Sequence, residues 1–298
     1  MSDYLQVSNF LEPQILEAEK DFLIVFKPPK MHSAPLAKSS DKTILDWCAR
    51  EYPEVVDFAD EEELFNDNTQ TEIPDRYTEE GGLLHRLDYE THGLLLVART
   101  LRGKEILVEQ QKQRRIIKEY NAITGENKVT HEGFPNDKPN LPFWIFRDKH
   151  RIGDSINIKS AFRPYGPGRK VVRPVLPDVQ QQNYLKSVKH GQEIALDGYR
   201  PYLTDVITGR FLSNADEMAE TQTPVLTFFR LRILRGFRHQ IRCHLAWAGR
   251  PILNDTLYNG FSYGKGFLGL RACSLSFADP SSAKELSFSI TPLELEDI

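Results

Sequence analysis

Short apolar runs alternate along the chain with segments of helical spacing. Residues 22–26 are apolar without interruption and stop at a Lys-Pro-Pro turn, so they predict a buried strand. The runs 94–98 and 116–124 predict two further strands. Between these two runs, Thr100 can cap a helix that reaches about residue 113. This mixture of strands and helices predicts an α+β fold with a mixed sheet and loops inserted on one side.

The remaining apolar patterns extend this prediction toward the C-terminus. Helical spacing is found at residues 43–52 and 238–248, and strand composition at residues 225–234 and 268–277. In the strand 225–234, Leu226 and Phe228 alternate with other side chains, and the phase shifts before Leu231 and Ile233. The helix 238–248 is expected to end at Gly249.

Two segments have the composition of loops. Residues 126–150 are rich in Asn, Asp and Pro, and residues 162–169 contain two prolines and two glycines. Such a density is unusual inside a helix or a strand, so the second segment predicts a basic loop that carries aromatic rings. We therefore expect the whole of 126–224 to be a loop-rich insertion.

The composition is that of an ordinary globular protein. The 298 residues include 40% hydrophobic and 27% charged side chains, enough for one large domain or two lobes. No apolar run approaches the ~20 residues that cross a bilayer, and the N-terminus lacks the pattern of a secretory signal. The three cysteines are widely spaced and form no metal-ligand pair. A reducing, cytoplasmic location without a membrane partner is the expectation.

Charge is distributed unevenly along the chain. Residues 54–80 hold eleven acids and one arginine, −10 in total, so the other residues carry +6 of the net charge of −4. We expect 54–80 to be an acidic surface insertion. Basic clusters occur at 163–173 and 230–242. This asymmetry favours a polyanionic partner, although a charge run is usually a solvated surface.

Three places offer candidate chemistry. Asp88 follows His85 and Arg86 at a bend before the run 94–98, where it forms either a tight turn or a reactive carboxylate. Tyr120 lies on the strand 116–124 and is either a strand-forming residue or a functional ring. Arg238 and Arg242 are four residues apart, so they would share one face of the predicted helix, beside His239. A solvated basic helix is the alternative there.

Together these places resemble the ordered motifs of the RluA-type pseudouridine synthases. The matching stretches are residues 21–36 with the Lys-Pro turn, 85–98 with His-Arg-Leu-Asp-x-x-Thr-x-Gly-Leu-Leu-Leu, 118–125 with Lys-x-Tyr-x-Ala, and 236–258 with His-Gln-Ile-Arg-x-His-Leu and Gly-x-Pro-Ile-x-x-Asp-x-x-Tyr. The resemblance implies a mixed, largely antiparallel sheet with flanking helices and a central cleft. It also implies a catalytic domain at 21–298 after an N-terminal extension at 1–20.

The same resemblance implies the roles of individual residues. Asp88 would be the catalytic carboxylate, Tyr120 would stack on the target base, and Arg242 would be the cation paired with Asp88. The further residues expected to bind the substrate are Arg86, His85, His239 and Leu270. The implied substrate is a flipped-out uridine in structured ribosomal or transfer RNA. Isomerisation needs no redox or phosphoryl step, so no cofactor, no metal and no obligate protein partner is expected.

Three positions depart from the motifs. His92 stands where Ser or Ala is common, Phe237 stands at a usual Arg position, and Arg271 replaces the His of a Leu-His-Ala sequence. The basic clusters 163–173 and 230–242 are expected to flank the cleft, and the acidic insertion to face away from it. These departures could alter the choice of substrate.

Two other classes of function were weighed. A non-catalytic RNA-binding protein or chaperone could retain the scaffold, although the joint presence of Asp88, Tyr120 and Arg242 argues against it. A metal-dependent hydrolase could use His85, Asp88, His239 and His244. Their spacing is not that of a compact metal motif, which argues against a hydrolase. Attack on the ribose, attack on the base and removal of a ribose proton all remain open as the role of Asp88.

Overall fold

The chain forms two compact units. The computed structural model describes residues 4–35, 42–56, 80–127, 131–146, 155–176, 201–212 and 225–298. Unit 1 consists of Met1–Asn121 and Leu270–Glu294, and unit 2 of Ala122–Gly269 and Leu295–Ile298. Strand β4 (Ile117–Gly125) begins in unit 1 and ends in unit 2. The catalytic domain at 21–298, expected after an extension at 1–20, stays a prediction. Most of the predicted acidic insertion, residues 57–79, lies outside the described residues.

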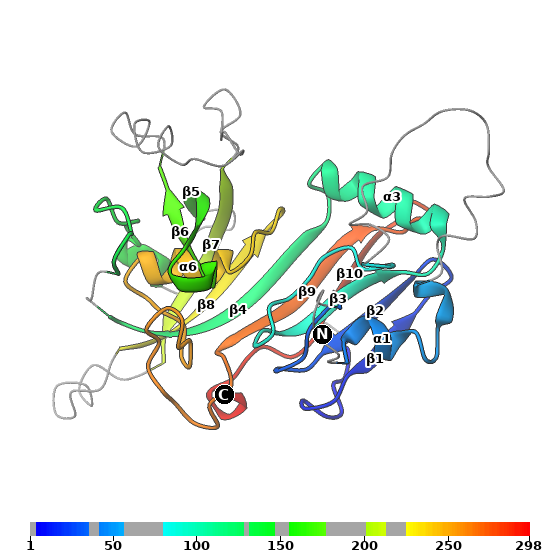
Figure 1. Ribbon diagram of the computed structural model, residues 1–298, viewed down its shortest axis with the longest axis horizontal. Helices are drawn as coiled ribbons and strands as arrows, with labels where there is room; N and C mark the ends of the chain where they lie inside the picture. Colours follow the sequence, from blue (N-terminus) through cyan, green and yellow to red (C-terminus); the bar gives the residue numbers. More distant parts are fainter. Residues whose placement is uncertain are drawn as a thin grey trace. The chain divides into compact units, whose positions relative to one another are not determined.

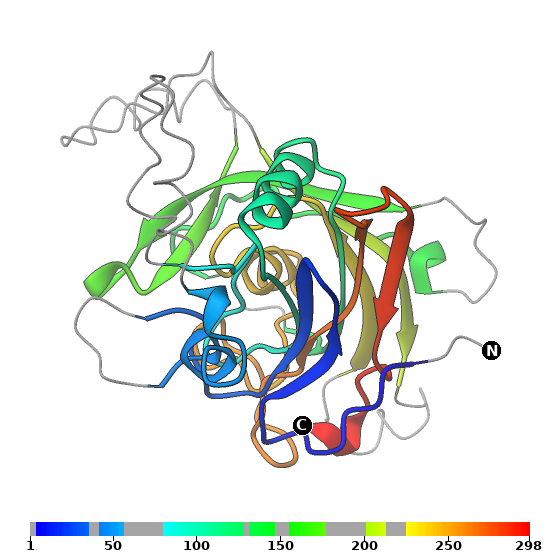
Figure 2. The ribbon, with the colours of Figure 1, turned by 90° about the vertical axis from the view of Figure 1, so that its right-hand side faces the viewer.

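Unit 1 is built on a mixed sheet. Its strands are β1 (Gln14–Ala18), β2 (Phe22–Lys27), β3 (His92–Ala98), β9 (Leu270–Ala278), β10 (Glu285–Ser289) and the first part of β4. The order is β1-β2-β3-β9-β4, with β10 on β9. The pairs β1–β2, β2–β3 and β9–β10 are antiparallel, and β3–β9 is parallel. Figure 2 shows β1 and β2, in blue, side by side. A mixed, largely antiparallel sheet was the expected fold.

Two helices accompany these strands. They are α1 (Ile44–Cys48) and α3 (Leu101–Lys112), and a 3₁₀ turn, η1 (Pro53–Val55), follows α1 (Figure 1). Thr100 caps α3 as predicted, because its hydroxyl accepts a hydrogen bond of 3.0 Å from the Gly103 amide. Thr43 caps α1 in the same way and forms a capping box with Asp46. Both helices therefore begin where the sequence indicates.

The core of unit 1 explains the uninterrupted apolar runs. Every residue of β2 and of β3 is buried, so both faces of these strands are covered. Alternate side chains of β2 and β3 pack in one cluster with Leu107 of α3 and Phe277 of β9. Full burial of such side chains stabilises the fold by about 1.5–3 kcal/mol each. Phe26 near the end of β2 and Leu94 near the start of β3 both belong to this core.

Unit 2 contains an antiparallel ladder with one helix. The strands are β5 (Ile156–Tyr165), β6 (Val171–Val175), β7 (Tyr202–Phe211) and β8 (Leu226–Ile233), in the order β4-β8-β7-β5-β6. Helix α6 (Gln240–Trp247) packs against β6 and β7 (Figure 1). Short 3₁₀ turns lie at η3 (Phe143–Phe146), η4 (Pro167–Arg169) and η6 (Leu295–Asp297). No helix in the described parts of the chain is long and apolar enough to cross a membrane.

Several sequence predictions differ from this structure. The segment 162–165, predicted as a loop, is the second half of β5, and only 166–169 form a turn. Pro164 is tolerated because residues 161–165 pair with β6, whereas β7 pairs with residues 156–160. In β8 the buried positions are Thr227, Phe229, Leu231 and Ile233, so the strand has no change of phase. Strands β1, β6, β7 and β10 and the first half of β5 were not predicted, so the segment 126–224 contains more regular structure than expected.

Candidate active site

Asp88 lies in a short loop of unit 1 that leads into β3. The backbone of this loop is fixed from several sides: Ser33 Oγ donates to the Leu87 carbonyl at 2.9 Å and accepts from the Leu87 amide at 3.0 Å. The Thr91 amide closes the turn on the Asp88 carbonyl at 3.1 Å. Asp88 itself is half-buried. The carboxylate is therefore presented by a loop with a defined backbone, whichever role it has.

Lys27, predicted only as part of the Lys-Pro turn, interacts electrostatically with Asp88. Its side chain is fully buried at the end of β2, and Nζ donates to three carbonyls, those of Pro28, Met31 and Tyr89, at 2.9, 2.7 and 3.3 Å. Burial lowers the pKa of Lys27 to about 7, although the carboxylates of Asp88 and Glu90 act in the opposite direction. A lysine at the end of a wholly apolar strand was the available signal.

Tyr120 lies on β4 in the part that belongs to unit 1, and its side chain is buried. Burial raises the pKa of its phenol, and the nearby Asp88 carboxylate and Cys273 thiol raise it further. The phenol is therefore neutral at physiological pH, and its ring is within electrostatic reach of Asp88. Both predicted residues belong to unit 1 and interact electrostatically, while stacking of Tyr120 on a base stays a prediction.

The other predicted substrate-binding residues of unit 1 differ in burial and in their partners. His85 accepts a long hydrogen bond of 3.4 Å from the Leu96 amide, and its Nδ1 has no partner among the described residues. Burial and then the Lys118 ammonium hold the pKa of His85 well below its usual range, so the imidazole is neutral. Arg86 is exposed and forms a surface ion pair with Glu80 at 3.3 Å. Leu270 is buried at the start of β9. Contacts of these residues with a substrate stay predictions.

Two of the three departures from the family motifs meet in unit 1. His92 and Arg271 are neighbours in the parallel pair β3–β9, and Arg271 Nε donates to His92 Nε2 at 3.1 Å. Both side chains are buried, and Phe10 packs edge-on against the imidazole with 4.7 Å between the ring centroids. Burial, Arg271 and Lys27 hold the pKa of His92 well below its usual range. A neutral imidazole at the first residue of β3, which follows the loop of Asp88, therefore accepts from a cation.

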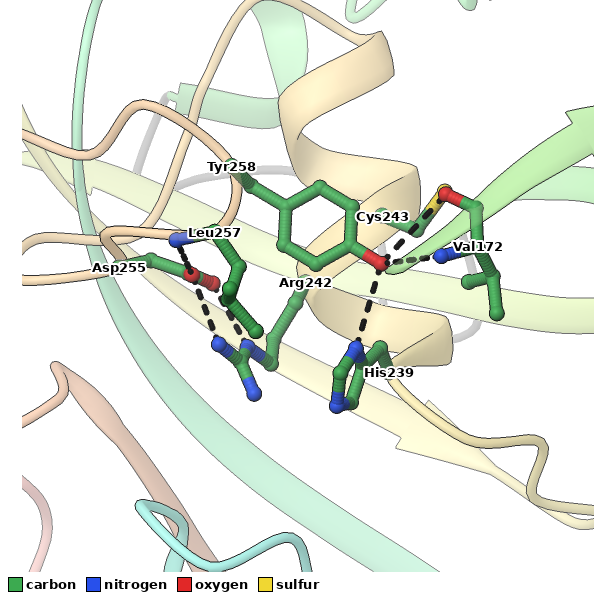
Figure 3. A network of polar contacts seen from close by, with 7 residues as sticks. All are labelled: Val172, His239, Arg242, Cys243, Asp255, Leu257 and Tyr258. Carbon is green, nitrogen blue, oxygen red and sulfur yellow. Dashed lines mark hydrogen bonds and ion pairs between the residues drawn. The ribbon is translucent and has the colours of Figure 1, made fainter. Parts of the chain in front are cut away.

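Arg242 belongs to helix α6 in unit 2 and forms a buried ion pair there. Its Nε and Nη2 donate to the two carboxylate oxygens of Asp255, each at 2.7 Å (Figure 3). Asp255 Oδ1 also accepts from the Leu257 amide at 3.1 Å. This bidentate geometry fixes the plane of the guanidinium. Since Asp88 and Arg242 lie in different units, their pairing stays a prediction.

The helix of Arg242 begins later than the sequence indicated. The prediction that Arg238 and Arg242 share a helical face is wrong, because α6 starts at Gln240. His239 precedes the helix with a left-handed backbone, φ 56°, which no helical residue adopts. Its Nδ1 lies 3.3 Å from the hydroxyl of Tyr258 (Figure 3). Arg238 therefore belongs to the loop before the helix.

His244, one of the ligands of the hydrolase hypothesis, is held by two hydroxyl groups. Both ring nitrogens of His244 are engaged, Nε2 with the Ser160 hydroxyl at 2.9 Å and Nδ1 with the Thr204 hydroxyl at 2.8 Å. Burial lowers the pKa of His244 to about 3. Within the described ranges, no group of three or more His, Cys, Asp or Glu side chains is arranged to hold a metal ion. The hydrolase hypothesis loses one of its proposed ligands.

Comparisons with known proteins agree with the motifs. Residues 21–247 match the family described as RNA pseudouridylate synthase. The ribosomal large subunit pseudouridine synthase D of Escherichia coli (strain K12) is 31% identical over 254 residues, which cover 84% of this chain and 55% of that protein. The protein of the same name from Buchnera aphidicola subsp. Schizaphis graminum (strain Sg) is 24% identical over 94% of this chain and 70% of its own length.

A solved structure supports the fold. Human RNA Pseudouridylate Synthase Domain Containing 1 aligns with a TM-score of 0.53 at 18% sequence identity, covering 96% of this chain and 86% of that chain. At this identity the likeness shows the fold alone. The match over residues 21–247, more than half of the sequence, shows the family. The chain belongs to the RNA pseudouridylate synthase family.

Proposed function

We propose that this protein converts uridine to pseudouridine in RNA and that Asp88 is the catalytic carboxylate. The observation that carries the proposal is the arrangement in unit 1, where Asp88 acts electrostatically on both Tyr120 and Lys27 and lies on a loop whose backbone is fixed. A carboxylate can act as the nucleophile or the base of an isomerisation without a cofactor, and an aromatic ring can stack on the detached base.

The reaction balances without an outside reagent. The N1–C1′ bond of the uridine breaks, the uracil turns, and a C5–C1′ bond forms while C5 loses its proton and N1 gains one. Asp88 acts as the nucleophile or the base. Tyr120 holds the detached uracil by stacking, which contributes about 1–3 kcal/mol per base. Arg242, oriented by Asp255, supplies positive charge to Asp88 or to the substrate. The uridine enters by leaving its helix.

Ribosomal RNA is the proposed substrate, since the relatives named above are called ribosomal large subunit pseudouridine synthases. The chain spans 55% of the Escherichia coli relative and 70% of the Buchnera one, so the substrate of this chain needs its own test. Transfer RNA is the second candidate substrate. A cytoplasmic location, where both RNAs are available, accompanies the proposal.

The test uses purified protein and RNA that lacks pseudouridine. We expect the wild type to produce pseudouridine at a defined position of ribosomal RNA in site-resolved mapping. Asp88→Asn should produce none while binding the same RNA with a similar Kd, because the two side chains have nearly the same size. If wild type and Asp88→Asn both bind RNA and neither modifies it, the non-catalytic RNA-binding function is correct instead.

A further inference from the structure

Two described segments of unit 2 carry several cations and no carboxylate of their own. They are the β5–β6 hairpin, residues 155–176, and the loop 234–239, and together they are called here the cationic arm. The hairpin has five cationic residues and the loop two, without a single carboxylate, in a chain of net charge −4. The exposed ones are Lys159, Arg169, Lys170, Arg235 and Arg238. Among the described residues, the Glu132 carboxylate accepts from the Tyr165 hydroxyl of the hairpin, and Asp205 interacts with Arg232.

The two parts of the arm are joined by direct contacts. The rings of Phe162 and Phe237 stack with 5.1 Å between centroids and 8° between planes, and Tyr202 packs against both. Arg238 Nη2 donates to the Arg169 carbonyl at 2.7 Å. Two basic clusters that are far apart in the sequence therefore form one surface. Phe237, the third departure from the family motifs, is the ring that joins them.

The arm is also tied to the helix of Arg242. The Tyr258 hydroxyl accepts from the Val172 amide of β6 at 3.0 Å, and Cys243 of α6 donates to the Val172 carbonyl at 3.4 Å (Figure 3). The same Tyr258 hydroxyl lies near His239, and the guanidinium of Arg242 lies 5.6 Å from the Tyr258 ring centroid. Anions held by the arm would therefore lie at a fixed position relative to Arg242 and His239.

Aromatic rings hold several of the guanidinium groups in place. Arg163 and Arg173 both pack on the Tyr165 ring, at 5.1 and 4.6 Å from its centroid, and Arg235 packs on Tyr202 at 4.4 Å. Arg163 and Arg173 also donate to the backbone carbonyls of Gly133, Glu132 and Val172. Arg235 is exposed, and a guanidinium that stacks on a ring can present its N–H edge to a planar or tetrahedral anion. Since the side chains are held before binding, less conformational entropy is lost when an anion is bound.

We infer that the cationic arm binds the sugar–phosphate backbone of the substrate RNA beside the residues Arg242 and His239, and that it contributes to the choice of RNA. The inference rests on the proposed function for the identity of the polyanion. RNA is favoured over an acidic protein because the arm combines several exposed cations with the ring-stacked guanidinium of Arg235, an arrangement that suits a row of phosphates.

The test neutralises the exposed end of the arm in the full-length protein. The triple variant Arg169→Gln/Lys170→Gln/Arg238→Gln is compared with Lys20→Gln/Arg102→Gln/Lys284→Gln, three exposed cations of unit 1. A ribosomal RNA fragment is titrated at several salt concentrations. The slope of log Kd against log salt should fall by roughly 2–3 in the arm variant, with a loss of affinity on the order of tenfold to a hundredfold. The unit 1 variant should bind as the wild type does.

A second variant separates the joining of the arm from its charge. Phe237→Ala keeps all seven cations but removes one ring of the stack, so KM should rise while the salt slope stays that of the wild type. Phe237→Tyr, which preserves the ring, should restore KM. A KM unchanged in Phe237→Ala would refute the joining role. If the triple variant has the Kd and the salt slope of the wild type, the arm does not bind RNA.

The outcomes also separate the arm from the proposed function. If the wild type makes no pseudouridine but the arm variant still loses RNA affinity, the function fails and the arm stands. Polyglutamate of matched length serves as the acidic polypeptide. If polyglutamate competes with RNA at equal charge concentration, and if its binding is weakened by the same triple substitution, the surface is a general anion site. The assignment to RNA is then wrong.

Discussion

Replacing Asp255 by alanine removes the carboxylate that receives two N–H groups of Arg242. The side chains of Arg242 and Asp255 are only 4% and 0% exposed, so the remaining guanidinium stays buried without its acceptor. Breaking a buried ion pair from one side costs about 3–5 kcal/mol. With a shift of about 2–4 °C for each kcal/mol in a protein of this size class, the Tm should fall by roughly 6–20 °C.

The control for this prediction is the ion pair of Arg250 with Glu126. These two groups are 3.6 Å apart and 15% and 36% exposed, so Glu126→Ala should cost at most about 1 kcal/mol. Thermal and urea unfolding of the two variants gives the comparison. The double variant Arg242→Met/Asp255→Leu should regain most of the lost stability but no activity, because it removes both charges. Equal losses in Asp255→Ala and Glu126→Ala would refute the reasoning.

Three further predictions concern unit 1. The pKa of Lys27 is about 7 in the fold against an ordinary 10.5, so between these pH values the unfolded chain binds more protons and the stability of the fold should rise with pH. Urea unfolding at pH 6.5, 8 and 9.5 gives the stability of the wild type minus that of Lys27→Met. This difference should increase with pH, and a constant difference would contradict the prediction. Gly93 has φ +122°, and an added Cβ would lie 2.2 Å from the Ala272 carbonyl oxygen, so Gly93→Ala should lose at least about 1–3 kcal/mol of stability. An unchanged Tm would show that the β3–β9 contact can adjust. Arg271→His should cost about 1–3 kcal/mol of stability, because it leaves the buried acceptor of His92 unsatisfied. Adding His92→Ser should recover part of this stability in a double-mutant cycle. A coupling free energy near zero would show that the contact does not stabilise the fold.

The elements that could be predicted from the sequence are those specified by neighbouring residues. An apolar run such as that of β2 is buried on both faces, and this is visible without knowledge of its partners. Thr100 caps α3 through a bond to a residue three positions away, so the helix start is equally local. Asp88 and Tyr120 were identified because the motifs around them resemble a known family, not because their proximity could be derived.

What could not be predicted depends on distant partners. Pro164 argues against a strand until it is known that its half of β5 pairs with the terminal strand β6. Leu226 and Phe228 were predicted as the alternating apolar positions of their strand, but Thr227 between them is the buried one, and its carbonyl accepts from the Thr124 hydroxyl of β4. Lys27 became a site residue only through the Tyr89 carbonyl, 62 positions away in the sequence. In each case the local composition is compatible with two states and a remote contact decides between them.

The positions at which the chain departs from the family motifs are not the proposed reacting residues. His92, which follows the Asp88 loop, and Arg271 contact each other, and Phe237 contacts the hairpin that the family motifs do not include. Asp88, Tyr120 and Arg242 are the residues that the motifs require. An enzyme that keeps one reaction and acts on a different RNA should change the supports and the RNA contacts while it keeps the reacting groups. A scaffold without catalysis would have no reason to separate the two sets, so this distribution favours the catalytic proposal and makes the cationic arm the first place to look for the choice of RNA.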